Sequence, residues 1–112
     1  MSLSRFEGPL HANLTEEVAA SLGESARRLR KALDLLARHD ADVAAGSRPQ
    51  SNAVRRDLLA EAAEKLWGYV VQRELVGLRD PEYIRDQYQV PDDVWRSMGP
   101  AAISRRRAAQ LS

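Results

Sequence analysis

Residues 18–43, VAASLGESARRLRKALDLLARHDADV, place a large apolar side chain at every seventh position. At about 100° per residue, side chains seven positions apart lie on the same face of an α-helix. The stripe consists of Leu22, Leu29, Leu36 and Val43, flanked by Val18, Ala26, Leu33 and Ala37. The opposite face is rich in charged residues. The segment therefore predicts one long helix, from about Leu14 toward Val43, that packs on one side and is solvated on the other.

Polar residues mark both ends of this helix. Asn13, followed by Glu16 three residues later, has the spacing of a capping box and predicts the first turn. Asp40 lies inside the apolar stripe, and both Asp40 and Asp42 are close to the negative end of the helix dipole. We therefore expect the helix to fray or bend near these aspartates, before Gly46.

The loop GSRPQS, at residues 46–51, separates this helix from a second one, with Ser51 or Asn52 as the N-cap. The second helix is predicted from about Ala53 to Val76. Its apolar residues form two stripes, so its C-terminal half is expected to be covered on two sides. One stripe contains Leu59, Ala62, Leu66, Tyr69, Arg73 and Val76, and the other contains Trp67, Val71, Leu75 and Leu78.

Turn-forming residues end the second helix and begin two short ones. Gly77 suits the left-handed position of a Schellman ending. Asp80-Pro81-Glu82 begins a short helix, with a proline at its first position and an acid in its first turn. Val90-Pro91-Asp92-Asp93 begins another, which Gly99-Pro100 ends. No segment alternates apolar and polar residues as a half-buried strand does. The predicted fold is all-α: a long antiparallel helical hairpin plus two short C-terminal helices.

The 112 residues fit a single helical domain, residues 1–112. Within it, residues 1–12 predict an extended N-terminal arm and residues 101–112 a weakly ordered tail. A hairpin of two such helices leaves apolar surface uncovered, which we expect along Leu22 to Leu36 and along Leu58 to Leu66. Covering it favours a two-fold homodimer with a core like that of a four-helix bundle. A monomer with the short helices folded back is the alternative.

Composition and charge limit the classes of function that the chain can have. Hydrophobic residues make up 44% and charged residues 29%, which is typical of globular proteins. A net charge of +1 gives no overall field toward nucleic acid or an anionic membrane. The absence of cysteine excludes disulfides, thiolate zinc sites and thiol catalysis. The sequence predicts no membrane-spanning helix, and its N-terminal residues lack the apolar core of a secretory signal. We therefore expect a cytoplasmic protein with no membrane partner.

Four charged residues at the end of the second helix form the candidate polar cluster. Arg73 and Glu74 are predicted to project into the apolar arc, and Arg79 and Asp80 follow directly. Buried charges are unfavourable unless they are paired, so these residues need partners. One interpretation is a guanidinium–carboxylate site for an anionic ligand. The favoured interpretation is an ion-pair network that fixes the turn before the short helices.

Patterns typical of catalysis are weak, and no catalytic, cofactor-binding or metal-binding residue is predicted. Asp57, Glu61 and Glu64 lie within two turns of one helix, as in magnesium-dependent nucleotide pyrophosphatases, but a second acidic pair is missing. His11 and His39 lack the spacing of metal ligands and are interpreted as surface residues. No nucleophile motif and no glycine-rich phosphate loop is present. A metal-dependent nucleotide hydrolase is therefore a distant third function.

Residues 81–98 carry the alternative function, a small regulatory nucleic-acid-binding protein. Their two short helices, joined at Gln89-Val90, imitate the spacing of a helix-turn-helix. However, the second helix would begin with Asp92 and Asp93, which repel phosphate where groove contacts are needed. Nucleic acid is therefore not a favoured partner.

Residues 70–99, VVQRELVGLRDPEYIRDQYQVPDDVWRSMG, carry a resemblance to known proteins. The matching residues are Gln72, Arg73, Glu74, Leu75, Gly77, Leu78, Arg79, Asp80, Ile84, Arg85, Tyr88, Pro91 and Val94. The stretch resembles the C-terminal half of a family of small helical proteobacterial proteins of about this length, described only as a domain of unknown function. The resemblance implies an all-helical fold and brings no activity or ligand. The sequence thus favours a non-enzymatic structural or protein-interaction module, without cofactors, that acts as a homodimer.

Overall fold

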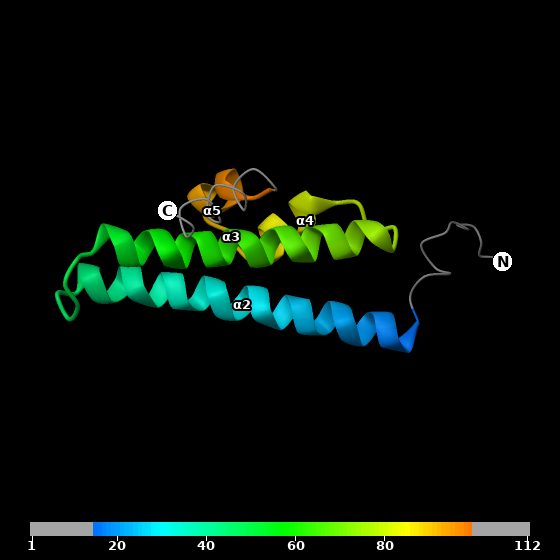
Figure 1. Cartoon of the computed structure of the whole chain (residues 1–112), viewed down its shortest axis with the longest axis horizontal. Helices are drawn as coiled ribbons and strands as arrows, with labels where there is room; N and C mark the ends of the chain where they lie inside the picture. Colours follow the sequence, from blue (N-terminus) through cyan, green and yellow to red (C-terminus); the bar gives the residue numbers. More distant parts are fainter. Residues whose placement is uncertain (1–14, 100–112) are drawn as a thin grey trace, which may run out of the picture.

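The structure, a computed structural model, describes residues 15–99, which form four helices and no strand (Figure 1). Helices α2 (Glu16–Ala44) and α3 (Asn52–Leu75) lie side by side and antiparallel. Two short helices follow, α4 (Pro81–Gln87) and α5 (Asp92–Ser97), and α5 packs on α3. The predicted all-α hairpin with two short C-terminal helices is confirmed.

The predicted N-terminal arm at residues 1–12 and tail at residues 101–112 lie outside the described residues, as does the predicted cap, Asn13. Helix α2 begins at Glu16 rather than at Leu14, because Thr15 serves as the N-cap. The Thr15 hydroxyl accepts a hydrogen bond from the backbone N–H of Val18 at 3.2 Å. It thereby satisfies one of the unpaired donors of the first turn.

The C-terminal end of α2 is regular, so the predicted fraying or bend near Asp40 and Asp42 is wrong. The helix continues to Ala44 and ends in a Schellman motif, with Gly46 at a φ of 79°. The N–H of Gly46 donates to the Val43 carbonyl at 3.1 Å, and the N–H of Ser47 donates to the Asp42 carbonyl at 3.0 Å. These bonds satisfy the last carbonyls of the helix.

Helix α3 has the ends that the sequence predicts. Of the two candidate caps, Ser51 is the one used, and its hydroxyl accepts from the Val54 N–H at 3.3 Å. The predicted Schellman ending is confirmed, with Gly77 at a φ of 94°. The N–H of Leu78 donates to the Arg73 carbonyl at 2.8 Å. Because this bond reverses the chain tightly, α4 begins close to the end of α3.

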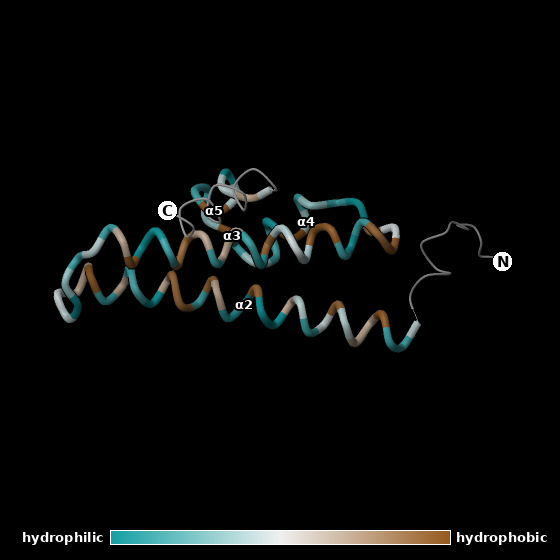
Figure 2. The backbone as a smooth tube through the Cα atoms, viewed as in Figure 1, coloured by the Kyte–Doolittle hydropathy of each residue, from teal (hydrophilic) through white to brown (hydrophobic). Residues whose placement is uncertain are grey.

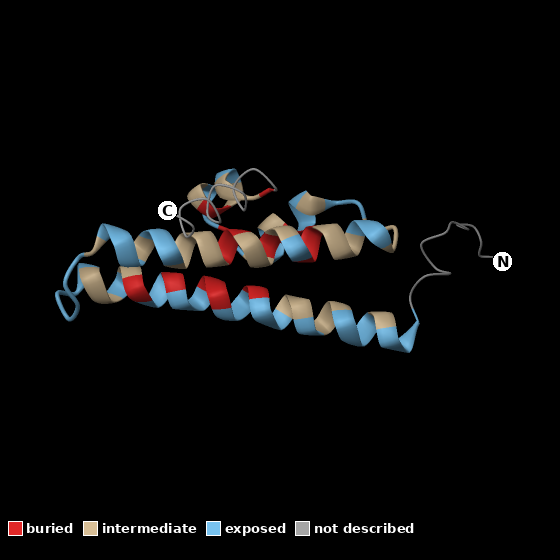
Figure 3. Ribbon diagram, viewed as in Figure 1, coloured by how far each residue is buried: buried red, intermediate tan, exposed pale blue. Residues whose placement is uncertain are grey.

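The core lies between the middle parts of α2 and α3 and extends under the short helices (Figure 3). It consists of Leu29, Ala32, Leu33, Leu36, Ala62, Ala63, Leu66, Tyr69, Val70, Ile84, Val90 and Val94. Figure 2 shows apolar and polar residues alternating turn by turn along α2, as its predicted one-sided packing requires. The buried face is turned slightly from the predicted stripe, because Ala32 is buried whereas Ala37 is exposed.

The prediction that Leu22 to Leu36 and Leu58 to Leu66 remain uncovered is largely wrong. Leu29 and Leu66 are both 0% exposed within the single chain, and Leu22 and Leu58 are half-buried against the core. The physical reason is the buried pair Ala62 and Ala63, whose small side chains allow α2 and α3 to approach closely. The hairpin therefore closes most of its own core.

The open end of the hairpin is less well packed. Residues 16–28 of α2 include no buried residue (Figure 3). A polar contact joins the helices there, with the Gln72 side chain bonded to Ser21 and Ser25. Leu75, which the sequence places in a covered stripe, is 76% exposed. It lies in the last turn of α3, beyond the reach of α5, so nothing among residues 15–99 covers it.

Candidate functional site

The predicted polar cluster is only partly assembled. Arg73 donates from Nη2 to Asp80 Oδ1 at 3.2 Å, and its side chain is 12% exposed. Glu74 and Arg79 are exposed. The prediction that Glu74 projects into the apolar arc is therefore wrong. Arg73 occupies the inward face beside Tyr69, and the next residue points about 100° away.

Aromatic rings rather than carboxylates provide most of the surroundings of Arg73. Its guanidinium carbon lies 5.7 Å from the ring centre of Tyr69 and 5.4 Å from that of Tyr83, within the range of cation–π attraction. Tyr69 packs edge-on against Tyr88, and Arg30 of α2 lies 4.8 Å above the Tyr88 ring. Burial raises the pKa of Tyr88, which keeps its hydroxyl neutral. These contacts join α2, α3 and α4 and favour the structural interpretation of the cluster.

Sequence reasoning missed a second charged cluster, where α2, α3 and α5 meet. Arg55 donates from Nε and Nη2 to the two carboxylate oxygens of Asp40, each at 3.0 Å. The same Nη2 donates to Asp93 at 3.0 Å. The hydrogen bond from Arg55 holds the pKa of Asp40 below its usual value, and Asp40 in turn raises the pKa of Arg55. A bidentate pair of this kind fixes the relative position of the helices.

His39 belongs to this cluster, so its interpretation as a surface residue is wrong. Its ring is 3% exposed, and Nδ1 lies 3.0 Å from the Asp40 carboxylate. His39 follows Leu36 by three positions and therefore lies on the same helix face. A usable signal was present, because the loop at residues 46–51 brings Asp40 and Arg55 level with each other across an antiparallel hairpin. His11 lies outside the described residues.

The acidic residues of α3 that resemble a magnesium site lie at the surface of the helix. Glu61 pairs with Lys65 at 3.3 Å, and Asp57 is exposed. Among residues 15–99 no three His, Cys, Asp or Glu side chains are grouped to hold a metal ion. In the same residues no helix combines the length and hydrophobicity that crossing a membrane requires.

Residues 81–98 form the two helices that the helix-turn-helix hypothesis predicts. Acidic side chains lie at the start of the second helix, where phosphate would have to bind. In α5 the side chain of Val94 is buried. Asp92, at the start of the helix, accepts from Arg85 at 2.8 Å, and Asp93 accepts from Arg55. Arg85 and Arg55 therefore already bind carboxylates at the start of this helix, which reduces the positive charge there for phosphate.

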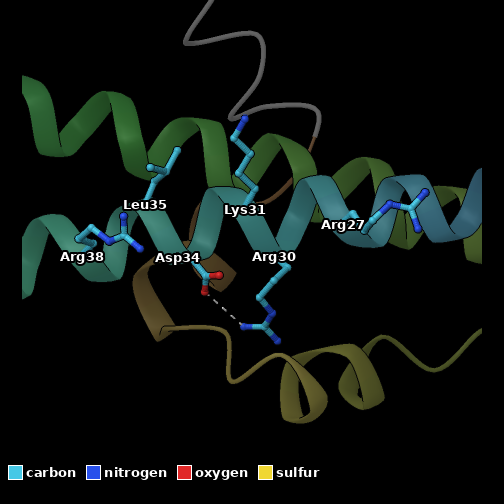
Figure 4. A pocket seen from close by; sticks show the side chains of 6 residues that line it. All are labelled: Arg27, Arg30, Lys31, Asp34, Leu35 and Arg38. Carbon is cyan, nitrogen blue, oxygen red and sulfur yellow. Dashed lines mark ion pairs between the residues drawn. The ribbon is translucent and has the colours of Figure 1, made fainter.

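The outer face of α2 carries a shallow groove of about 420 Å³ (Figure 4). The described residues that line it are Arg27, Arg30, Lys31, Asp34, Leu35 and Arg38. Figure 4 shows Lys31 and Leu35 projecting from one side of the helix, whereas Arg30 and Asp34 project from the other. Leu35 is 45% exposed, in contrast to its buried neighbours Leu33 and Leu36. The groove thus combines an apolar side chain with a surrounding of cations.

Charges of α2 are arranged in blocks. The middle of the helix, residues 27–38, carries five basic side chains and one acidic one. The preceding part contains Glu16, Glu17 and Glu24, and Glu24 pairs with Arg27 at 2.9 Å and with Arg28 at 3.3 Å. Within residues 16–38, helix α2 therefore carries its acidic and basic side chains largely in separate segments.

Comparison with the sequence models of known families gives a match. The sequence model of a family described as "Family of unknown function (DUF6665)" matches residues 8–107. The match covers both helices of the hairpin and so extends beyond residues 70–99, on which the resemblance rests. No curated protein and no solved structure matches the chain.

Proposed function

The chain belongs to this family of unknown function, and we propose that it is a non-enzymatic protein-interaction module that acts as a homodimer in the bacterial cytoplasm. The observation that carries the proposal is the outer face of α2. A groove there contains the half-exposed Leu35. Contacts of α2 with the rest of the described chain are concentrated on α3, which packs against the opposite face.

A helix is a suitable partner for this face. The groove follows the α2 axis over three turns, from Arg27 to Arg38. Two helices pack side by side when rows of side chains three and four positions apart interlock. A second hairpin placed on this face would produce the four-helix arrangement expected of the homodimer. The interface lies on the charged side of α2, because the apolar side is already filled within the chain.

An enzymatic role receives less support. The polar clusters that a substrate would use are occupied, since Asp40 and Asp93 bind Arg55, and Arg73 lies against tyrosine rings. Nucleic-acid binding through residues 81–98 is also less supported, because Asp92 and Asp93 lie in the first turn of the second helix and repel phosphate.

The test of the homodimer is molar mass in solution as a function of concentration. Sedimentation equilibrium of the full chain at concentrations up to about 1 mM should show a mass rising from 12.5 kDa toward twice that value. The absence of any rise over this range contradicts the homodimer. A parallel titration with duplex DNA and single-stranded RNA tests the alternative, and binding lost steeply with salt would favour it.

A further inference from the structure

We propose that two copies of the chain pair through an antiparallel, self-complementary contact between their α2 helices. The residues involved are here called the outer seam: Glu17, Ala20, Glu24, Lys31, Leu35 and Arg38. This inference rests on the proposed homodimer. It adds the surface, the register of the two helices and the interaction that sets this register.

The outer seam is a single straight stripe. Its members follow one another at steps of three, four, seven, four and three positions, which keeps them within an arc of about 60° at 100° per residue. All six side chains are exposed. The stripe lies roughly opposite Leu29 and Leu36, which face the core. Contact with a second copy along this stripe therefore leaves the core of the hairpin unchanged.

The seam matches itself when a two-fold axis passes between residues 27 and 28. Glu17 then faces Arg38 of the second copy, and Glu24 faces Lys31 of the second copy. Leu35 faces Ala20 of the second copy, so that the exposed leucine of the seam lies over the smallest seam residue. Because the operation is two-fold, every contact occurs twice.

Three of the four charged side chains of the seam are available for this pairing, and the fourth, Glu24, already contacts Arg27 and Arg28. Within residues 15–99, the side chains of Glu17, Lys31 and Arg38 form no ion pair or hydrogen bond with another residue. Arg27 and Arg28 flank the axis, and Glu24 already neutralises part of their charge. Exposed ion pairs add little binding strength individually, but a pairing that opposes like charges, as a parallel in-register contact does, is repelled. The charge pattern thus selects one orientation and makes the dimer sensitive to salt.

A second copy fits this surface better than nucleic acid does. The seam has one acidic and one basic segment, whereas a phosphate backbone needs positive charge throughout. Leu35 at the centre of the basic part also favours an apolar contact. The acidic segment of α2 in one copy complements the basic segment of α2 in the other. The two segments lie at equal distances from the two-fold axis.

The experiment is a charge exchange across the seam, followed by sedimentation velocity. Glu17→Arg and Arg38→Glu alone should each weaken the dimer about tenfold or more at low salt, because each puts like charges face to face. The two together restore opposite charges and should return the dissociation constant to within about threefold of the original. Glu16→Arg with Arg48→Glu is the matched control, because both residues are exposed and lie off the seam. This control pair should leave the dissociation constant unchanged.

Helical content measured by circular dichroism shows whether each variant remains folded. For a variant that does not fold, the same exchange between Glu24 and Lys31 provides the second test. A dimer whose affinity the single changes do not alter, or the double change does not restore, overturns the outer seam but leaves the proposed homodimer standing. A chain that stays monomeric without any substitution overturns both.

Discussion

Leu29→Glu unfolds the protein. Leu29 is fully buried at the contact between α2 and α3, and no cation of the described chain forms an ion pair beside it. A carboxylate at this position loses its hydration without gaining a partner. The expected loss exceeds about 4 kcal/mol, against a total stability of about 5–15 kcal/mol for a domain of ordinary size. Circular dichroism at increasing temperature should show no cooperative transition near that of the unchanged protein.

The matched control is Leu35→Glu, the same substitution six positions later on the opposite face of the helix. Leu35 is half-exposed, so the variant should stay folded and melt within a few degrees of the original. According to the outer-seam proposal it should weaken the dimer. If Leu29→Glu folds with an unchanged melting temperature, the assigned packing face of α2 is wrong.

Arg55→Ala should lower the free energy of unfolding by about 2 kcal/mol at neutral pH. The change removes three charge-assisted hydrogen bonds and leaves the carboxylates of Asp40 and Asp93 without their shared cation. Urea unfolding measures the difference. Arg56→Ala is the control, because Arg56 is the exposed neighbour of Arg55, and its effect should stay within about 0.5 kcal/mol.

The effect of Arg55→Ala also depends on pH. The folded-state pKa of Asp40 lies below its usual value of 3.8, because Arg55 binds the charged form. The stabilisation is therefore complete above the unfolded-state pKa and is lost as pH falls through the lower, folded-state pKa. The difference between Arg55→Ala and the unchanged protein should shrink in the acid range. An equal difference at neutral and acid pH would show that the ion pair with Asp40 contributes nothing.

The backbone plan could be predicted because local signals and packing agree. The seven-residue spacing of Leu22, Leu29 and Leu36 predicts α2, and Gly77 predicts the end of α3 through its positive φ. Hydrophobic periodicity and turn chemistry are properties of neighbouring residues, so one sequence is sufficient to detect them.

The side-chain clusters depend on where distant segments meet, and periodicity does not report this. Asp40 appears unfavourable within an apolar stripe until Arg55 is found opposite it, and the burial of His39 follows from the same contact. For Glu74 the prediction is wrong in the opposite direction, since the sequence predicts this residue in the apolar arc and it is exposed. A helix with two apolar stripes leaves its rotation undecided, and a rotation of one residue exposes this carboxylate.

The sequence also predicts the uncovered surface on the wrong side of the hairpin, because periodicity does not report how closely α2 and α3 pack. The buried alanines of α3 let the hairpin fill its own apolar face, so the face available for a partner is the charged one. Its complementary pattern becomes visible only after the buried arc of α2 has been located. The charged residues of α2, interpreted from sequence as a solvated surface, then become the proposed contact between two copies.

Cysteine cross-linking tests this contact most directly, because the chain contains no cysteine of its own. In the proposed pairing, Ala20 of each copy faces Leu35 of the other, whereas identical positions lie about 22 Å apart along the helix. A disulfide requires Cα atoms within about 7 Å of each other. Ala20→Cys with Leu35→Cys should therefore give a covalent dimer under mild oxidation, and neither single substitution should. A dimer that cross-links equally through either single cysteine, or not at all through the pair, would contradict the antiparallel pairing of α2.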